Sequence, residues 1–169
     1  MSGQDGIESL GLPADCAPEV REIVEYWLRI RPPHALPGRQ HFDPVDIPHL
    51  LSNVWLIDVG GIQMRFSFRL VGTGVVEYFG GDPTGRLLSD VFDGFEQTVA
   101  YKDFCRVVEE RRPRWRRGTP VLFHLDKFSR IERVYLPLAR NGEDVDMILC
   151  LSVFGVRGAD DSMSFTPLD

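Results

Sequence analysis

Apolar and polar residues alternate along residues 63–71, and this alternation predicts a β-strand with one buried face and one face in water. The predicted buried face carries Phe66, Phe68 and Leu70. The period breaks after Val71, and the short apolar segment 75–79 is stopped by the turn-forming residues 80–83. We therefore expect one or two helical turns after this strand, followed by a glycine-rich turn.

Two longer segments have the spacing of amphipathic helices. Residues 18–31 begin with a proline and end before Pro32, and their apolar stripe consists of Val20, Ile23, Val24, Trp27 and Leu28. Residues 93–110 begin with Asp93 and Glu96 at the spacing of a capping box. The residues expected on the inner side of this second helix are Phe95, Val99, Phe104, Val107 and Val108.

Further strands are expected at 54–59, 115–126, 129–138 and 146–154. Gly60-Gly61 predicts a two-residue hairpin between the first two strands, and Asn141-Gly142 a turn before the last. Strands on both sides of a helical block indicate an α+β fold with an antiparallel sheet. Helices should cover one face of the sheet, while the helix at 18–31 covers the other face or pairs with a second copy.

The length of 169 residues fits one domain. We expect a flexible N-terminal segment at 1–17, the folded domain at 18–156 and a flexible acidic tail at 157–169. No signal peptide or membrane-spanning run is recognisable, and the three cysteines are isolated from one another. These features predict a cytoplasmic protein without a disulfide framework.

The chain resembles the PAS sensory domain, and in particular a short single-domain PAS group of alphaproteobacteria. The residues that carry the resemblance are Tyr26-Trp27, the segment Asp43-Pro44 to Leu51, Phe68 to Thr73, Gly81 to Arg86, Leu136-Pro137-Leu138 and the strand 145–154. The resemblance implies a PAS-like five-stranded antiparallel sheet, helices over one face and a small central cavity. It also implies a function in sensing or protein–protein signalling, often as a dimer. No kinase, cyclase or DNA-binding segment is recognisable, so we expect output through a partner.

Aromatic residues from several predicted elements converge on the space between sheet and helices. The ligand-pocket candidates are Phe66, Phe68, Phe92, Tyr101, Phe104, Phe123 and Tyr135, with Phe95 beside them. They form either a packed core or the lining of a pocket for a small apolar or aromatic ligand, and a domain of this size needs a core in any case. Tyr101 and Tyr135 are the expected polar contacts, because a buried hydroxyl needs a partner.

The strongest charge feature is the arginine-rich segment 111–117. Its members, the candidates for a partner-binding patch, are Arg111, Arg112, Arg114, Trp115, Arg116 and Arg117. Arginines around an aromatic residue favour phosphate, nucleic acid or an acidic partner. The net charge of −6 argues against nucleic acid, and charge runs are usually solvated.

Other candidate sites have weaker support. Gly72-x-Gly74 follows a strand as in a dinucleotide fingerprint, but Glu77 occupies the third small position, which favours a simple hinge. His124 could hold haem and Cys105 resembles a flavin-reactive cysteine, but a solvated histidine and an ordinary buried thiol are the favoured interpretations. No histidine has metal-ligand spacing and no catalytic motif occurs, so no metal and no enzyme activity are expected, and the cofactor is unknown.

The preferred hypothesis is a sensory or adaptor domain that binds a small molecule or a signalling protein. It is expected to be a homodimer, because the stripe of Val20, Ile23, Val24 and Trp27 is too apolar to leave in water. The alternative is a nucleic-acid or nucleotide-binding protein that uses the segment 111–117, and a small-molecule enzyme ranks third.

Overall fold

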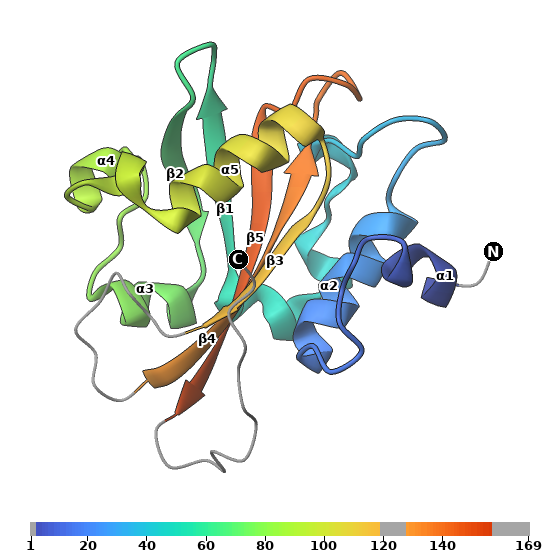
Figure 1. Cartoon of the computed structure of the whole chain (residues 1–169), viewed down its shortest axis with the longest axis horizontal. Coiled ribbons are helices and arrows are strands. Elements are labelled where there is room, and N and C mark those ends of the chain that lie inside the picture. Colours follow the sequence, from blue (N-terminus) through green and yellow to red (C-terminus); the bar gives the residue numbers. More distant parts are fainter. Residues whose placement is uncertain (1–2, 119–127, 157–169) are drawn as a thin grey trace.

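An antiparallel sheet forms the centre of the molecule (Figure 1). The computed structural model of the chain describes residues 3–118 and 128–156. Within these residues, five strands stand in the order β2-β1-β5-β4-β3. They are β1 (Val54–Gly60), β2 (Arg65–Val71), β3 (Arg114–Gly118), β4 (Phe128–Leu138) and β5 (Met147–Val156). The prediction of an α+β fold with a five-stranded antiparallel sheet is confirmed.

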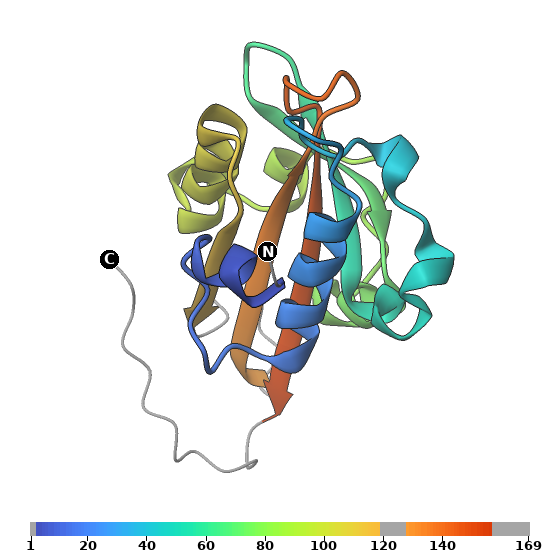
Figure 2. The ribbon, with the colours of Figure 1, turned by 90° about the vertical axis from the view of Figure 1, so that its right-hand side faces the viewer.

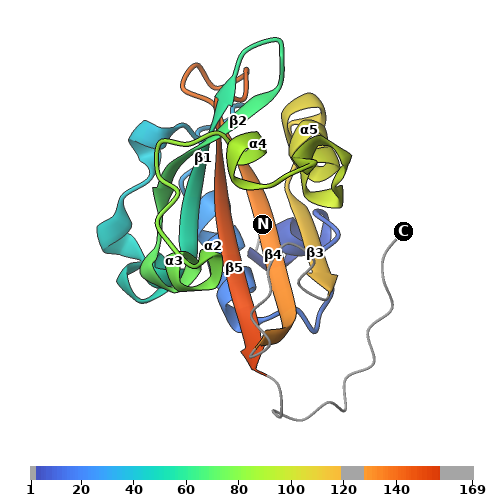
Figure 3. The ribbon, with the colours of Figure 1, turned by 90° about the vertical axis from the view of Figure 1, so that its left-hand side faces the viewer.

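Helices lie on both faces of the sheet, as the two opposite views in Figures 2 and 3 show. One face carries α3 (Thr73–Phe79), α4 (Leu88–Val91) and α5 (Val99–Glu110). The other carries α2 (Pro18–Arg29), with the short α1 (Gly3–Glu8) beside it. Short 3-10 helices occupy η1 (Arg39–His41), η2 (Pro44–Asp46), η3 (Pro48–Asn53) and η4 (Phe95–Gln97). No helix of the described residues is long and apolar enough to cross a membrane.

The apolar stripe of α2 packs on its own sheet. Val20, Ile23 and Val24 are 0 % exposed and Trp27 is 1 % exposed within the single chain. The Trp27 indole Nε1 also donates a 2.9 Å hydrogen bond to the backbone oxygen of Pro137 in β4. The stripe therefore needs no second copy to leave water, and the argument that made it a dimer interface no longer holds. The homodimer itself stays a prediction.

The segment before α2 is described from residue 3 onward. Ile7 of α1 is 2 % exposed, and Leu12 and Cys16 are buried as well. The expected flexibility of residues 1–17 and the proposed domain boundaries stay predictions. The expected acidic tail at 157–169 lies outside the described residues.

A β-bulge changes the predicted face of one residue in β2. Leu56 pairs with Leu70, but the next residue, Ile57, pairs with Phe68, so Arg69 is inserted between the two pairs. An extra residue reverses the alternation of side chains that follow it. Phe66 and Phe68 are buried as predicted, whereas Leu70 is 46 % exposed.

Two predicted boundaries are also wrong. The hairpin between β1 and β2 has a loop of residues 61–64 instead of two residues, because Gly60 still pairs with Arg65. The helix expected at 93–110 begins only at Val99, after Gly94 has taken a φ of 70° and η4 has made a separate turn. Thr98 is the N-cap, with its Oγ1 3.2 Å from the Tyr101 backbone N–H that it accepts. Val99 consequently points outward and is 49 % exposed.

Candidate functional site

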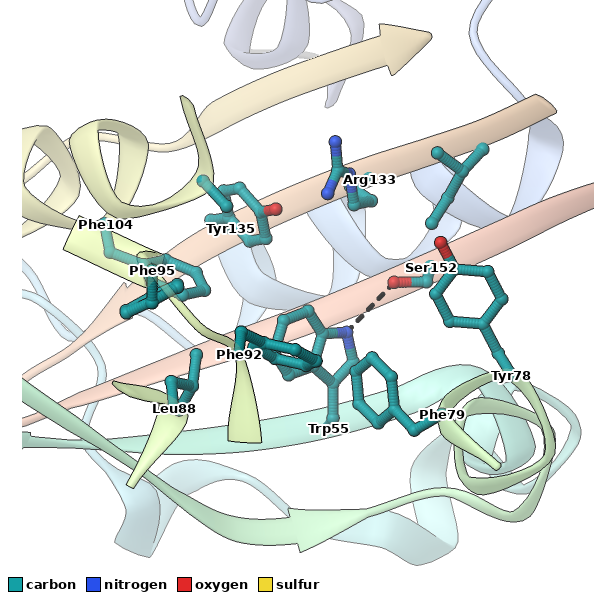
Figure 4. Close-up of a pocket in the computed structure, with 12 residues that line it drawn as sticks. Trp55, Tyr78, Phe79, Leu88, Phe92, Phe95, Phe104, Arg133, Tyr135 and Ser152 are labelled. Atoms are coloured by element: carbon teal, nitrogen blue, oxygen red, sulfur yellow. Dashed lines mark hydrogen bonds between the residues drawn. The ribbon is translucent and has the colours of Figure 1, made fainter. Parts of the chain in front are cut away.

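A small cavity lies between the sheet and the helices α3, α4 and α5 (Figure 4). Its volume is about 20 Å³, which is space for about one water molecule. The sheet forms its floor, and residues of α3, α4, η4 and α5 form its cover. The lining residues are Trp55, Tyr78, Phe79, Leu88, Phe92, Phe95, Ala100, Phe104, Ile131, Arg133, Tyr135 and Ser152.

The structure brings part of the predicted pocket set to this cavity. Phe92, Phe104 and Tyr135 line it, together with Phe95. Phe66, Phe68 and Tyr101 lie outside the lining and pack against aromatic rings there: Phe66 against Phe95 and Phe104, Phe68 against Trp55, and Tyr101 against Phe95. Phe123 lies outside the described residues.

Sequence reasoning found Tyr135 but missed two other polar members of the lining, Arg133 and Ser152. Both stand opposite each other on the antiparallel strands β4 and β5. A signal for Arg133 was available, because residues 131, 133 and 135 alternate along one strand and must share a face. Ser152 is buried and accepts a 3.0 Å hydrogen bond from the indole Nε1 of Trp55.

Two buried polar atoms of the cavity have no hydrogen-bond partner within the described part of the chain. They are the Tyr135 hydroxyl and the Nε of Arg133. Figure 4 shows the Tyr135 hydroxyl and the Arg133 side chain on the same side of the cavity. Tyr135 is 0 % exposed, so solvent at the surface does not satisfy its hydroxyl. Buried polar groups are nearly always hydrogen-bonded, which makes this pair the most unusual feature of the core.

Burial raises the pKa of both cavity tyrosines, Tyr78 and Tyr135, to about 12, and the nearby Arg133 cation partly opposes the rise. Both phenols are therefore neutral at physiological pH, when Tyr135 presents an unused O–H donor beside a guanidinium group. Together the two residues offer hydrogen-bond donors and one positive charge inside an aromatic chamber.

The predicted partner patch is largely engaged within the chain. Arg116 makes a two-point ion pair with Asp103 of α5, at 2.6 and 3.0 Å, and Arg114 lies 3.8 Å from both Asp103 and Glu110. Hydrogen bonding to Asp103 raises the pKa of Arg116. These contacts tie the edge strand β3 to α5.

The remaining cations of the patch contact other distant segments. Arg117 bonds the carboxylate of Asp15 at 2.9 Å and that of Glu132 at 3.3 Å. Glu132 also accepts 2.8 Å bonds from the Trp115 indole and the backbone N–H of Ala17. The two flanking arginines make looser contacts: Arg111 lies 3.5 Å from Glu143, and Arg112 donates to the Ser9 oxygen at 3.3 Å. The segment thus fastens the N-terminal part to the sheet, and no feature of it favours nucleic acid.

The Gly72-x-Gly74 motif has a packing explanation. A Cβ on Gly72 would lie 2.3 Å from the backbone oxygen of Leu51, and one on Gly74 would lie 3.0 Å from that of Ser52. The glycines let the start of α3 approach η3 closely, as the hinge interpretation requires. Gly80, with a φ of 73°, ends α3 as predicted.

The candidates for metal, haem and flavin chemistry gain no support. Among the described residues, no group of three or more histidine, cysteine or acidic side chains could hold a metal ion. His124 lies outside those residues. Cys105 is partly buried beside Tyr101, and burial raises the pKa of its thiol, which makes it a weaker nucleophile.

A family model described as PAS domain matches residues 16–152, from just before α2 into β5. No curated protein matches the chain. The match covers most of the chain and includes every residue that lines the cavity.

Proposed function

The chain belongs to the PAS domain family, and from this premise we propose that it is a sensory or adaptor domain that binds a small molecule, a protein partner or both in signalling. Membership of the short single-domain group of alphaproteobacteria and a cytoplasmic location are part of this proposal. The family match supports a sensory or signalling module, and the cavity supports the small-molecule part.

The observation that carries the proposal is the fully buried Tyr135 hydroxyl, which has no partner in the described chain. An unsatisfied buried polar group costs on the order of 1–3 kcal/mol of folding free energy. A core selected for stability alone would have phenylalanine at this position. A ligand that accepts a hydrogen bond from Tyr135 recovers this free energy when it binds, which couples binding to the stability of the domain.

We propose binding without catalysis. The described lining of the cavity contains neither a carboxylate nor an imidazole nor a thiol that could act as a general base. Ser152 already accepts a bond from Trp55, and no base stands beside it in that lining. The cavity can recognise a ligand, because it combines aromatic rings with a few hydrogen-bond donors.

A homodimer belongs to the proposal because PAS domains commonly associate. The residues proposed for its interface, Val20, Ile23, Val24 and Trp27, face their own sheet in this structure. A second copy would therefore contact the polar outer side of α2 or another surface.

Native mass spectrometry of protein purified from its own host tests the small-molecule function. We expect a mass above that of the denatured chain, from a ligand released on denaturation. Ala100→Val places two more methyl carbons at the cavity lining and should reduce or abolish the excess mass. Val99→Phe on the exposed side of the same helix is the matched control and should keep it. Equal native and denatured masses, even after incubation with host extract, would overturn the small-molecule part of the proposal.

A further inference from the structure

We propose that the ligand of the cavity is a small carboxylic acid with an aromatic or aliphatic body, whose carboxylate is bound by Arg133 and Tyr135. This inference rests on the proposed function and names its ligand class. The evidence comes from the charge of the cavity, its unpaired donors, its walls and its cover.

Arg133 is a cation that the described chain leaves without a carboxylate. Its cross-strand neighbour Arg116 forms an ion pair with Asp103, and Arg114 contacts the same carboxylate. On the other face of β4, Glu132 is occupied by Arg117. No ion pair of Arg133 exists within the described residues, although its Nε is buried. A half-buried guanidinium without a counterion favours an anionic ligand.

Tyr135 supplies a second donor to the same place. Its hydroxyl is buried and unpartnered, and it lies on β4 two residues from Arg133, on the same face. Its raised pKa of about 12 keeps it protonated, so its O–H is available as a donor. A carboxylate has two oxygens, one for the guanidinium and one for the phenol, and it satisfies both orphan groups at once.

The walls select the rest of the ligand. Rings from Trp55, Phe104 and Tyr135 meet edge to face, with the Phe104 and Tyr135 centroids 4.7 Å apart and those of Trp55 and Phe104 6.0 Å apart. These faces favour an apolar or aromatic body. A cationic ligand would be repelled by Arg133. A phosphate carries up to about two negative charges, whereas the described lining offers one cation.

The cover must open to admit such a molecule, because about 20 Å³ does not hold an aromatic ring. Part of the cover consists of short elements: α3 contributes Phe79, and Phe92 follows α4. Their rings pack on each other with centroids 5.6 Å apart. We infer that the ligand separates Phe79 from Phe92 and takes the space between them, while the sheet keeps its position.

Calorimetry and tryptophan fluorescence of the intact protein test this ligand class, since Trp55 lies in the lining. The probes are two charged and neutral pairs of equal shape: benzoate with benzamide, and hexanoate with hexanamide. We expect at least one acid to bind at least about tenfold more tightly than its amide. Tyr135→Phe and Arg133→Met should each reduce that preference, whereas the exposed Arg65→Gln should leave it unchanged.

The outcomes separate the inference from the function on which it rests. The proposed carboxylate ligand would be overturned if the amides bind as tightly as the acids or more tightly. It would also be overturned if the preference for the acids survives Arg133→Met in a folded protein. The small-molecule function would then still stand. If mass spectrometry shows a retained host ligand but the protein binds none of the probes, the carboxylate ligand class alone is overturned. No binding together with no retained ligand would overturn both.

Discussion

Asp103 of α5 and Arg116 of β3 form a two-point ion pair, with Arg116 Nε 2.6 Å from Oδ2 and Nη2 3.0 Å from Oδ1. The carboxylate is 2 % exposed, so it depends on this partner in place of water. The pair connects the helix above the cavity to the edge strand of the sheet. It explains why a run of arginines that resembles a binding patch is needed for the fold.

Asp103→Asn should therefore destabilise the domain by about 3 kcal/mol, because it leaves Arg116 and Arg114 without their shared anion. Chemical denaturation measures the change. Glu109→Gln, on the exposed side of the same helix, is the control and should change the free energy of unfolding by less than about 0.5 kcal/mol. Equal losses in both variants would contradict the structural role of the ion pair.

Gly72→Ala should destabilise the protein strongly, by several kcal/mol, because the new Cβ would meet the Leu51 backbone oxygen at 2.3 Å. Gly81→Ala is the matched control, since a Cβ there meets nothing within 4 Å and the residue has no positive φ. We expect a large fall in the melting temperature for the first variant alone. A near-neutral Gly72→Ala would mean that α3 does not approach η3 so closely.

Two tyrosines should ionise late in an alkaline titration. The pKa of Tyr78 and of Tyr135 is raised from near 10 to about 12 in the folded protein, so folding favours their protonated form. This contribution to the free energy of unfolding is complete below pH 10 and is lost as the pH rises to about 12. For Tyr135 it amounts to on the order of 2 kcal/mol. Phenolate absorbance follows the titration, and Tyr135→Phe should remove one late step. Ionisation of all tyrosines near pH 10 in folded protein would contradict the burial.

Phe68→Asp should cost several kcal/mol, because it places an unpaired carboxylate beside the buried rings of Trp55 and Phe92. Arg69→Asp on the exposed bulge should cost far less. Thermal unfolding of the two variants compares the faces of β2. Similar melting temperatures would contradict the face assignment.

Removal of residues 1–31 should expose the sheet face that α2 covers. Each aliphatic residue of the stripe contributes on the order of 1.5–3 kcal/mol through burial. We expect the shortened chain to aggregate or to bind a dye for exposed apolar surface, while the intact chain does neither. Sedimentation of the intact chain also measures the predicted homodimer. A stable, well-folded shortened chain would show that α2 is dispensable for the fold.

The sequence predicted the elements whose signals are local. The strand alternation at Phe66 and Phe68, the stripe of α2 and the glycine stop after α3 all depend on neighbours within a few residues. Leu70 was misplaced because a bulge is a property of two paired strands, and single-residue alternation does not contain it. The helix start at Val99 was missed because both Asp93 and Thr98 are suitable caps, and Gly94 decides between them only through its φ of 70°.

The site was harder to predict because its chemistry depends on distant pairings. Arg116, Arg117 and Arg133 are the same residue type on adjacent strands, and only the fold gives two of them acidic partners. Asp15 is about a hundred positions from Arg117, and no spacing rule connects the two. The aromatic half of the cavity was accessible from composition and periodicity. The alternation along β4 also placed Arg133 on the face of Tyr135, but the register of β4 against β3 was needed to show that its neighbour there is Arg116 and not an acidic residue.

The alternation along β4 has an evolutionary consequence. Arg133 and Tyr135 face the cavity, while Glu132 between β3 and the N-terminal segment faces the other way. A substitution that changes the cavity lining and one that changes the contacts of the N-terminal segment therefore fall on neighbouring residues with side chains on opposite faces of the sheet. Under the proposed function, an exchange of Arg133 for another side chain would change the ligand specificity of the cavity and leave the contacts of Glu132 with Trp115 and Arg117 in place.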